Sequence, residues 1–449
     1  MTSSLPTGAK SLDARWHAAA SSYLRDLNAP AVWAGITTFL WYAVGIVPVQ
    51  IAIIGQFGLA APQVSSWIFI IWFTGAISSI GLSLVYRQPI PITSSIPALI
   101  FMGTLAGQYT FAELIGANLL AGVLIAALGF LRVGERILVW LPMPLAMGML
   151  AGSILGEVTR VVSATVDDVV VAGATVAGYV IGRTLRNPRI PPVAFALATG
   201  GLAVLVAHTA TPGPIEFSLP SLVLPKMQFS LAAVAAISVP LVVLSMGLGN
   251  VQGLGFLAAQ GYRVPANQVT LVLGLNSMIN AFFGGHSAIV SRNGMPIMAS
   301  PEAGPLGGRY WANIISAALT LLIAVAAVPV TGLLGILPHS YIVAVAGLAI
   351  LPSLQSALEK AFASTLRFGG VVTFVIAATT PFSVLGITSA FWALLAGVTV
   401  SFLAEREELL VHWRGEPTSQ AVKSEKAARP VLRELPVRSA PRQAPDKAA

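Results

Sequence analysis

Two stretches decide how the fold is interpreted: IPITSSIPALIFMGTLAG at residues 90–107 and SAIVSRNGMPIMAS at residues 287–300. Each is largely apolar, yet proline, serine and glycine interrupt it before one continuous helix could cross a membrane. Inside a bilayer, non-helical backbone is tolerated only where protein or a cavity satisfies its polar groups. The two stretches therefore predict a pair of broken membrane spans that border a cavity.

The composition places both stretches in a polytopic membrane protein. Of the 449 residues, 56% are hydrophobic and 9% are charged, whereas soluble domains carry about 25% charged residues. Apolar runs of roughly 20 residues recur along the chain and predict about fourteen transmembrane segments, hence an all-α polytopic membrane fold. The chain has no cysteine, so it forms no disulfide and no cysteine-ligated metal or redox centre.

Changes in composition divide the chain into four parts. We expect a cytoplasmic N-terminal segment (1–29), a first seven-span repeat (30–209), a second seven-span repeat (230–404) and a disordered cytoplasmic tail (405–449). With both termini inside, only Arg160 and Lys226 among the loop cations lie outside, as the positive-inside rule requires. The net charge of +8 then reports membrane topology, and no nucleic-acid partner is expected.

Four dipeptides recur in the same order along the chain. Their offsets are 195, 196, 195 and 196 residues, for Ala117-Asn118 with Ala312-Asn313, Leu141-Pro142 with Leu337-Pro338, Ala151-Gly152 with Ala346-Gly347, and Ala194-Phe195 with Ala390-Phe391. Because seven is odd, the second copy enters the membrane from the opposite side, which is the inverted-repeat plan of secondary transporters. On this alignment the broken third span (91–107) pairs with the broken tenth span (287–300), and Ser94 aligns with Ser291.

Polar residues at the starts of the two expected half-helices are candidate ligands for an anion. Helix starts present free N–H groups and a positive dipole end, and Ser94, Ser95, Ser291 and Asn293 are residue types that cap such ends. Arg292 belongs to neither loop set, and its guanidinium could pair with a carboxylate through two hydrogen bonds. Two alternatives stay open: Arg292 could pair with a structural acid or reach an interface, and the two serines of the third span could be caps only.

Other candidates lie outside the broken spans. Phe39 and Tyr42 in the first span could stack on an aromatic substrate, and Asn250 lies on a glycine-rich span; plain helix packing is the alternative for all three. His286 beside the tenth span is a candidate for proton coupling because histidine titrates near neutral pH, although a structural, hydrogen-bonded histidine fits as well. Glu113 at a span end is the second candidate for that role.

Motifs spread over residues 30–404 resemble one transporter family. They are SSWIF (65–69), YRQPI (86–90), LPMPLAMGMLAG (141–152), AAQGYRVP (258–265), FGGH (283–286), AGLAILPSL (346–354) and LGITSAFWALLAG (385–397). With these motifs the chain resembles the benzoate:proton symporters, relatives of the uracil permeases and of the sulfate-type anion transporters. The resemblance implies a core domain and a gate domain, with the site between the two half-helices and the spans near 39–50 and 245–252.

The same resemblance implies the function that we expect. It is proton-coupled import of an aromatic carboxylate such as benzoate across the inner membrane, by a multi-pass protein with cytoplasmic termini. The expected partners are the carboxylate, protons and the lipid bilayer, and we also expect a homodimer. No cofactor and no metal site are expected.

The sequence departs from the family pattern at the expected site. Where members commonly show Trp-Ser-Thr-Pro-Gly, this chain has TSSIPA at 93–98, so Ile96 joins the candidate residues. The Ser291-Arg292 pair looks more like the sulfate-type transporters. The places of two glutamates in the uracil permeases are held here by Met246 and Asn293, which argues against a nucleobase bound through carboxylates. An organic anion other than benzoate therefore stays open.

Other classes of protein can be compared with this interpretation. The sequence has no P-loop for a nucleotide and no His/Asp/Glu cluster with metal-ligand spacing, so we expect neither an enzyme nor an ATP-driven pump. An anion channel or exchanger on the same fold, or a nucleobase permease, remains the alternative. A channel would give large macroscopic currents, whereas a symporter would give slow, saturable uptake.

Overall fold

The computed structural model describes residues 23–132, 142–185, 190–211, 213, 216–291, 294–362, 365–379, 382–384 and 387–414. Helices dominate these residues, and two short antiparallel strand pairs interrupt them. The fold is therefore mostly helical rather than all-α as expected from the sequence. The expected ligands Arg292 and Asn293 lie outside the described residues.

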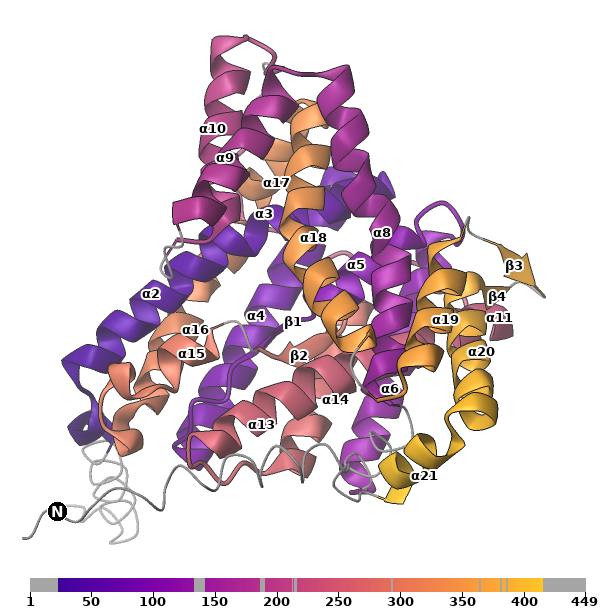
Figure 1. Ribbon diagram of the computed structural model, residues 1–449. Coiled ribbons are helices and arrows are strands. Elements are labelled where there is room, and N and C mark those ends of the chain that lie inside the picture. The colour runs from indigo at the N-terminus through magenta and orange to yellow at the C-terminus, as the bar shows by residue number, and fades with distance from the viewer. Residues whose placement is uncertain are drawn as a thin grey trace, which may run out of the picture.

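The first half of the chain runs from α2 to α10 (Figure 1). Its elements are α2 (Ala29–Gly45), α3 (Val47–Ile54), a 3₁₀ turn (Gly55–Phe57), α4 (Ala61–Tyr86), β1 (Ile92–Ser94), α5 (Ile96–Thr104), α6 (Phe111–Phe130), α8 (Met143–Asp167), α9 (Val171–Leu185) and α10 (Pro192–Val206). Helix α8 continues beyond the end at residue 156 that the sequence suggested. Its charged residues Glu157 and Arg160 form an ion pair at 3.2 Å within that last part, one turn apart.

The second half of the chain is less regular. Its elements are α11 (Leu231–Ala233), a π-helix (Val234–Ser238), α12 (Val239–Val243), a second π-helix (Leu244–Val251), α13 (Gln252–Ala259), α14 (Ala266–Phe282), β2 (Ala288–Val290), α15 (Met295–Met298), 3₁₀ turns (Pro301–Ala303 and Leu306–Gly308), α16 (Tyr310–Val325), α17 (Ala327–Ile336), α18 (His339–Ala361), α19 (Arg367–Ala378), β3 (Ser383–Val384), β4 (Ile387–Thr388), α20 (Ser389–Ala404) and α21 (Arg406–Arg414). The expected tenth half-helix is a single turn, because Pro296 allows a helix start but Pro301 and Gly304 prevent its continuation.

Two extended segments meet in the middle of the molecule. Strand β1 pairs antiparallel with β2, and Ile92 lies opposite Val290 while Ser94 lies opposite Ala288 (Figure 1). The backbone N–H of Ser95 donates to the carbonyl of Ser287 at 2.8 Å and so extends the pairing by one bond. These bonds satisfy the extended backbone that a membrane interior cannot hydrate.

Serine hydroxyls from the neighbouring helices hold the two strands at equivalent places. Ser79 on α4 accepts from the N–H of Ile92 at 2.7 Å, and Ser277 on α14 accepts from the N–H of Ala288 at 2.9 Å. The two serines are 277 − 79 = 198 residues apart, close to the offsets of the recurring dipeptides. The antiparallel strand pair with matched braces is what an inverted repeat predicts.

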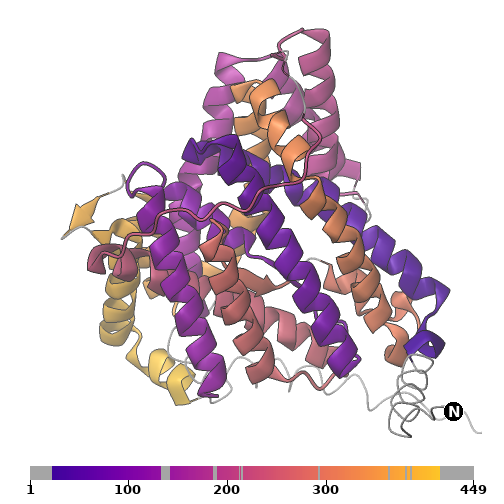
Figure 2. The same cartoon turned by 180° about the vertical axis from the view of Figure 1, so that it is seen from behind.

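The helices form two groups around the strand pair. In the first group, which we call the core group, α2 and α4 pack on α16, and α6 packs on α14. In the second, which we call the gate group, α8 packs on α18 and α19, and α9 packs on α10. Figure 1 shows α9, α10 and the start of α18 rising at the top, above α4, α13 and α14. In the view from behind, the segment 216–230 crosses the outside of the helices (Figure 2), where the N–H of Val223 donates to Ser66. That these two groups act as the core and gate domains implied by the resemblance stays a prediction.

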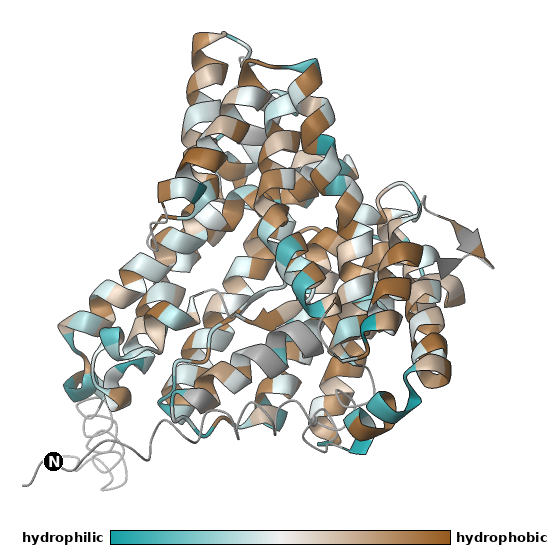
Figure 3. Ribbon diagram, in the orientation of Figure 1, coloured by the Kyte–Doolittle hydropathy of each residue, from teal (hydrophilic) through white to brown (hydrophobic). Residues whose placement is uncertain are grey.

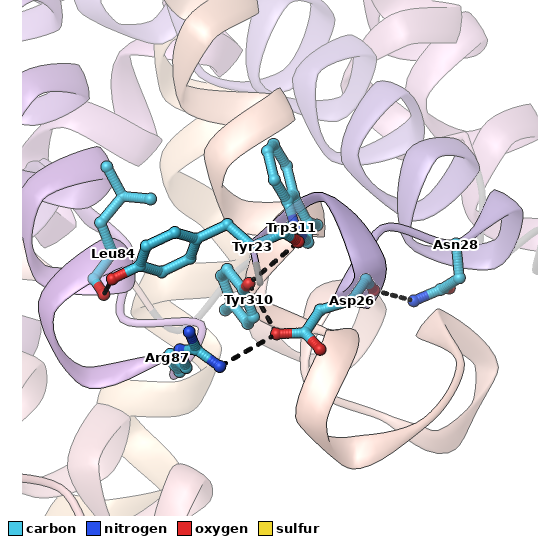
Figure 4. Close-up of polar contacts among 7 residues, drawn as sticks. All are labelled: Tyr23, Asp26, Asn28, Leu84, Arg87, Tyr310 and Trp311. Carbon is cyan, nitrogen blue, oxygen red and sulfur yellow. Dashed lines mark hydrogen bonds and ion pairs between the residues drawn. The ribbon is translucent and has the colours of Figure 1, made fainter. Parts of the chain in front are cut away.

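The chain before α2 is fastened to the core group. Asp26 accepts from the hydroxyl of Tyr310 at 2.9 Å and pairs with Arg87 at 3.4 Å, and the indole of Trp311 donates to the carbonyl of Tyr23 (Figure 4). The guanidinium of Arg87 also stacks over the ring of Tyr23, at 4.6 Å from its centroid. We call these five residues the N-terminal clasp. It ties the start of α2 to the end of α4 and the start of α16.

The sequence suggested a disordered tail from residue 405, and the structure differs at its beginning. Helix α21 covers Arg406–Arg414. Just before it, Glu405 accepts hydrogen bonds from the N–H groups of Phe368 and Gly369, and Glu408 accepts one from the N–H of Leu366. The two carboxylates thus cap the start of α19, which explains why these acidic residues are ordered.

The outer surface suits a bilayer. In the part of the chain that the structure describes, six helices are long and apolar enough to cross a membrane, and four apolar helices are shorter. Figure 3 shows hydrophobic residues along most helices and hydrophilic residues gathered on α21. The long spans are Ala29–Phe57, Ala61–Tyr86, Phe111–Phe130, Met143–Asp167, Leu306–Val325 and His339–Ala361.

Candidate substrate cavity

A cavity of about 390 Å³ separates the core group from the gate group. Its core side consists of residues of α2, α3, α4 and the two paired strands, and its gate side consists of residues of α9, α10 and α18. Arg183 and Pro352 at one end are exposed, whereas Ser94 and Ser291 at the other end are buried. The cavity therefore leads from the surface to the paired strands β1 and β2. Its size is typical of a small-molecule site.

Three aromatic rings contribute to the core side of the cavity. Trp41, Tyr42 and Trp72 all line it. The rings of Trp41 and Tyr42 meet edge to face with centroids 6.1 Å apart, and those of Tyr42 and Trp72 are tilted at the same separation. Such a wall offers a flat aromatic substrate large apolar contact and favourable ring–ring geometry.

We call β1 with the following α5 the first crossing, and β2 with the following α15 the second crossing. The first crossing brings a hydroxyl and apolar side chains to the cavity. Ser94 and Ile96 line it, as does Thr93. The hydroxyl oxygen of Ser94 accepts a hydrogen bond of 2.6 Å from Nε2 of Gln50. Ser95 does not belong to the described lining: its hydroxyl accepts from the N–H of Ala98 at 3.2 Å and caps α5. For Ser95, the geometry fits the alternative of a cap that does not meet substrate.

The second crossing contributes Ser291. Its hydroxyl oxygen accepts a hydrogen bond of 3.0 Å from the hydroxyl of Tyr42, and its backbone N–H donates to the carbonyl of Pro91. Tyr42 thus joins the aromatic wall to the start of the tenth span. The two serines that the repeat aligns, Ser94 and Ser291, therefore line one cavity.

Three sequence candidates lie elsewhere. Phe39 is half-buried against the main apolar core and is not among the described residues that line the cavity. Met246 is buried in a second apolar cluster. Asn250 donates to the hydroxyl of Thr270 at 2.8 Å on α14, and its Oδ1 has no partner among the described residues. This part of the chain is π-helical, so an α-helical projection does not give the direction of its side chains.

The candidate proton-coupling residues also lie away from the cavity lining. His286 is fully buried, and its Nδ1 accepts a hydrogen bond of 2.9 Å from the indole of Trp67. The proton of the neutral ring therefore lies on Nε2, and a second proton could bind only after Trp67 moves away. Glu113 forms a capping box with Thr110 at the start of α6. The contacts of Glu113 are those of a helix cap, whereas the buried Nε2 of His286 has no partner among the described residues; proton coupling through either residue stays a prediction.

Three residues in or directly behind the cavity wall were not singled out from the sequence: Trp72 and Arg183 line the cavity, and Gln50 is buried behind Ser94 and Trp72. Gln50 is a lone amide in the apolar run VPVQIAII, and Trp72 donates to its Oε1 at 2.8 Å. A buried polar residue in a membrane span is by itself a functional signal, and that signal identifies Gln50. Arg183 was counted only as a topology cation, yet it is the one charged residue in the described lining of this cavity.

Solved structures with the same arrangement are anion transporters. The overall structure of SLC26A9 superposes with a TM-score of 0.59 over 89% of this chain and 69% of that chain, at 15% sequence identity. The transmembrane domain of the cyanobacterial bicarbonate transporter BicA gives a TM-score of 0.56 over 82% of this chain and 97% of that chain, at 16% identity. The fold is that of their transmembrane domains, built from inverted repeats.

Sequence comparison gives the family. The family model of the benzoate membrane transport protein matches residues 25–403, and the chain belongs to that family. It is a transporter family and not an enzyme family. Two relatives are the inner membrane protein YdcO of Escherichia coli, 27% identical over 78% of this chain and 90% of its own length, and the benzoate membrane transport protein of Acinetobacter baylyi, 25% identical over 75% and 86%. The family expected from the sequence motifs is confirmed.

Proposed function

We propose that this protein is a secondary active transporter that imports an aromatic carboxylate such as benzoate across the inner membrane. The observation that carries the proposal is the cavity between core and gate, with three aromatic rings on its wall and serine hydroxyls at its buried end. The rings suit the apolar body of such a substrate, and the hydroxyls suit its carboxylate. The name of the Acinetobacter relative supports the same substrate class.

The proposal includes the membrane arrangement expected from the sequence. Fourteen spans form two inverted repeats, both termini are cytoplasmic, and the protein is a homodimer. With that orientation the exposed end of the cavity, at Arg183, faces the cytoplasm, where the last turn of α9 adds positive charge to the exit path. Arg292 and Asn293 are the further proposed ligands of the carboxylate, at the start of the tenth span.

Proton symport is part of the proposal because import of an anion into a negative interior needs a co-transported cation. No acidic residue belongs to the described cavity lining, so a carboxylate of the protein at that surface is not the proposed carrier. His286 stays the candidate carrier within the chain. The other route is entry of the proton on the substrate carboxylate itself.

Uptake by reconstituted protein tests the function. Purified transporter in proteoliposomes should accumulate labelled benzoate in a saturable manner when the outside is more acidic than the inside. Sulfate and uracil serve as competing substrates in the same assay. Uracil uptake with benzoate ignored would indicate a nucleobase permease, and large benzoate-independent anion currents would indicate a channel; either result contradicts the proposal.

A further inference from the structure

A chain of hydrogen bonds fixes the direction of one hydroxyl at the buried end of the cavity. It begins at Trp72, whose indole N–H can only donate a hydrogen bond. This N–H donates to Oε1 of Gln50 at 2.8 Å, and the Gln50 side chain is fully buried. The oxygen of the amide must therefore face Trp72, and its NH₂ group must face the other way.

The NH₂ group of Gln50 meets Ser94. Nε2 donates to the hydroxyl oxygen of Ser94 at 2.6 Å, so the Ser94 proton points away from Gln50. Among the described residues, none accepts a hydrogen bond from this hydroxyl, and Ser94 lines the cavity. A hydroxyl that accepts one hydrogen bond also becomes a stronger donor, because successive bonds polarise one another. Ser94 thus presents a polarised donor for which the described residues offer no acceptor.

We propose that Trp72 and Gln50 are positioning residues that hold the Ser94 hydroxyl as a donor to the substrate, and that this polarity selects a carboxylate over a carboxamide. The inference rests on the proposed function and deepens it by naming a determinant of substrate class. A carboxylate presents only acceptor oxygens, whereas a carboxamide presents one acceptor and an NH₂ group. An NH₂ group placed at Ser94 could use only the remaining lone pair of the hydroxyl and would leave the Ser94 proton without an acceptor.

The second crossing carries a parallel arrangement. Tyr42 donates to the oxygen of Ser291 at 3.0 Å, and no described residue accepts from the Ser291 hydroxyl. Both crossings therefore present hydroxyl donors to one cavity. The first chain makes the stronger case, because an indole N–H leaves no choice of direction, whereas a phenol can donate or accept.

The test compares benzoate with benzamide, which share a ring and differ in the group at Ser94. Affinities of both are measured by calorimetry on the purified, detergent-solubilised protein. Trp72→Phe removes the indole donor, so the Gln50 amide can turn and present its oxygen to Ser94. The preference for benzoate over benzamide should fall roughly tenfold, since a hydrogen bond to a charged group is lost for benzoate and one becomes available to benzamide.

Trp41→Phe is the matched control. Its ring lines the same cavity and is shortened in the same way, but no described hydrogen bond links it to Gln50. Lost ring contact weakens benzoate and benzamide alike, so in this control both affinities should fall together and their ratio should stay as in the wild type. Gln50→Met is the second variant: it removes the amide without adding charge, and it should lower the ratio as Trp72→Phe does.

The outcomes separate the inference from the proposed function. A lower ratio in each of the variants Trp72→Phe and Gln50→Met whose thermal unfolding is close to wild type supports the inference. An unchanged ratio in whichever of these variants folds overturns it and leaves benzoate transport standing. If the wild-type protein binds neither compound, both the inference and the proposed function fail.

Discussion

The first crossing, β1 and then α5, leads into a helix of nine residues, whereas the second, β2 and then α15, leads into one of four. Ser95 caps the first helix with its side chain, while Gly294 at the second start has no side-chain cap. The two crossings are thus alike in their backbone pairing and unlike in the helix that each strand enters. A helix dipole at the cavity is a property of the first crossing more than of the second.

The side chains that hold the two crossings differ as well. The second crossing is held directly: Asn118 donates to the carbonyl of Gly285 at 2.9 Å and accepts from the hydroxyl of Ser287. Its repeat equivalent, Asn313, donates to Ser83 on α4 at 2.8 Å and reaches the first crossing only through that helix. The comparison teaches that the repeat conserves the scaffold of paired strands, whereas polar side chains are concentrated on the second crossing.

The largest effect is expected from Arg292, which gives the second crossing a positive charge that the first crossing lacks. Arg292→Ala should weaken benzoate binding roughly 30- to several thousand-fold, because losing one partner of a buried charge pair costs about 2–5 kcal/mol. Arg292→Lys should restore binding only in part, since an ammonium lacks the planar fork. Calorimetric affinity and thermal unfolding of the same preparation are the measurements.

A stable Arg292→Ala protein with wild-type affinity would contradict the anion-binding role. A protein that unfolds early, with normal binding by its folded fraction, would indicate a structural pairing of the guanidinium instead.

The next effect concerns the two asparagines that the repeat aligns, Asn118 and Asn313. Asn118→Ala should lower the free energy of unfolding by about 2–4 kcal/mol, because the carbonyl of Gly285 and the hydroxyl of Ser287 lose their buried partner. Asn313→Ala, the matched control, should cost less, because the hydroxyl of Ser83 loses its bond of 2.8 Å and the carbonyl of Ser79 loses only a long contact of 3.5 Å. Thermal unfolding in detergent measures both. Equal losses would mean that the two crossings are braced alike.

A smaller effect separates a cap from a ligand within the first crossing. Ser95→Ala should cost about 1 kcal/mol of stability through the lost cap of α5 and leave benzoate affinity unchanged. Ser94→Ala should instead lower the affinity, and it should also cost about 1–3 kcal/mol of stability because the buried Nε2 of Gln50 loses its acceptor. The pair is compared by unfolding temperature and by affinity. Loss of affinity in Ser95→Ala at unchanged stability would place that hydroxyl at the substrate.

The smallest expected effect is a change in how the unfolding temperature falls at low pH. It concerns neither crossing, because residues 90–107 and 287–300 contain no acidic residue. Hydrogen bonds from the Ser340 hydroxyl and the Val171 amide hold the pKa of Asp168 below its ordinary value of 3.8, in the loop between α8 and α9. Because the folded pKa is lowered, this stabilisation is complete above about pH 4 and is lost as the pH falls through the folded pKa.

Asp168→Asn should therefore flatten the fall of unfolding temperature below about pH 4. The variant keeps a carbonyl oxygen as acceptor, so its unfolding near pH 7 serves as the control. An unchanged acid profile would assign the acid response to other carboxylates of the protein.

The sequence was a good guide where periodicity and composition decide the structure. Broken spans, the repeat offset and the capping types at Ser94, Ser95 and Ser291 follow from local chemistry, and the structure brings two of these serines to one cavity. Tyr42 could be placed beside them because its helix is regular. The family expected from the motifs is confirmed, whereas the core and gate domains that the resemblance implied stay a prediction.

The remaining part of the site depends on contacts that no local pattern contains. Gln50 is connected to Trp72, 22 residues away, and to Ser94, 44 residues away. The resemblance placed Met246 and Asn250 near the substrate; they lie on a π-helix, outside the described lining of the cavity, and their contact with substrate stays a prediction. The expectation that Arg160 belongs to an outside loop also differs from the structure, in which helix α8 extends to Asp167 and includes this residue.

The N-terminal clasp (Figure 4) constrains how the protein is made. Asp26 and Tyr310 are 284 residues apart in the chain. At typical synthesis rates of about 5–20 residues per second, Asp26 leaves the ribosome roughly 15 to 60 seconds before its partner exists. Throughout that interval the segment around residues 23–28 remains without this partner, on the side of the membrane where Tyr310 will later lie. The first repeat is therefore inserted before its own starting point can be fastened, and a late event of core assembly secures a segment that was synthesised early.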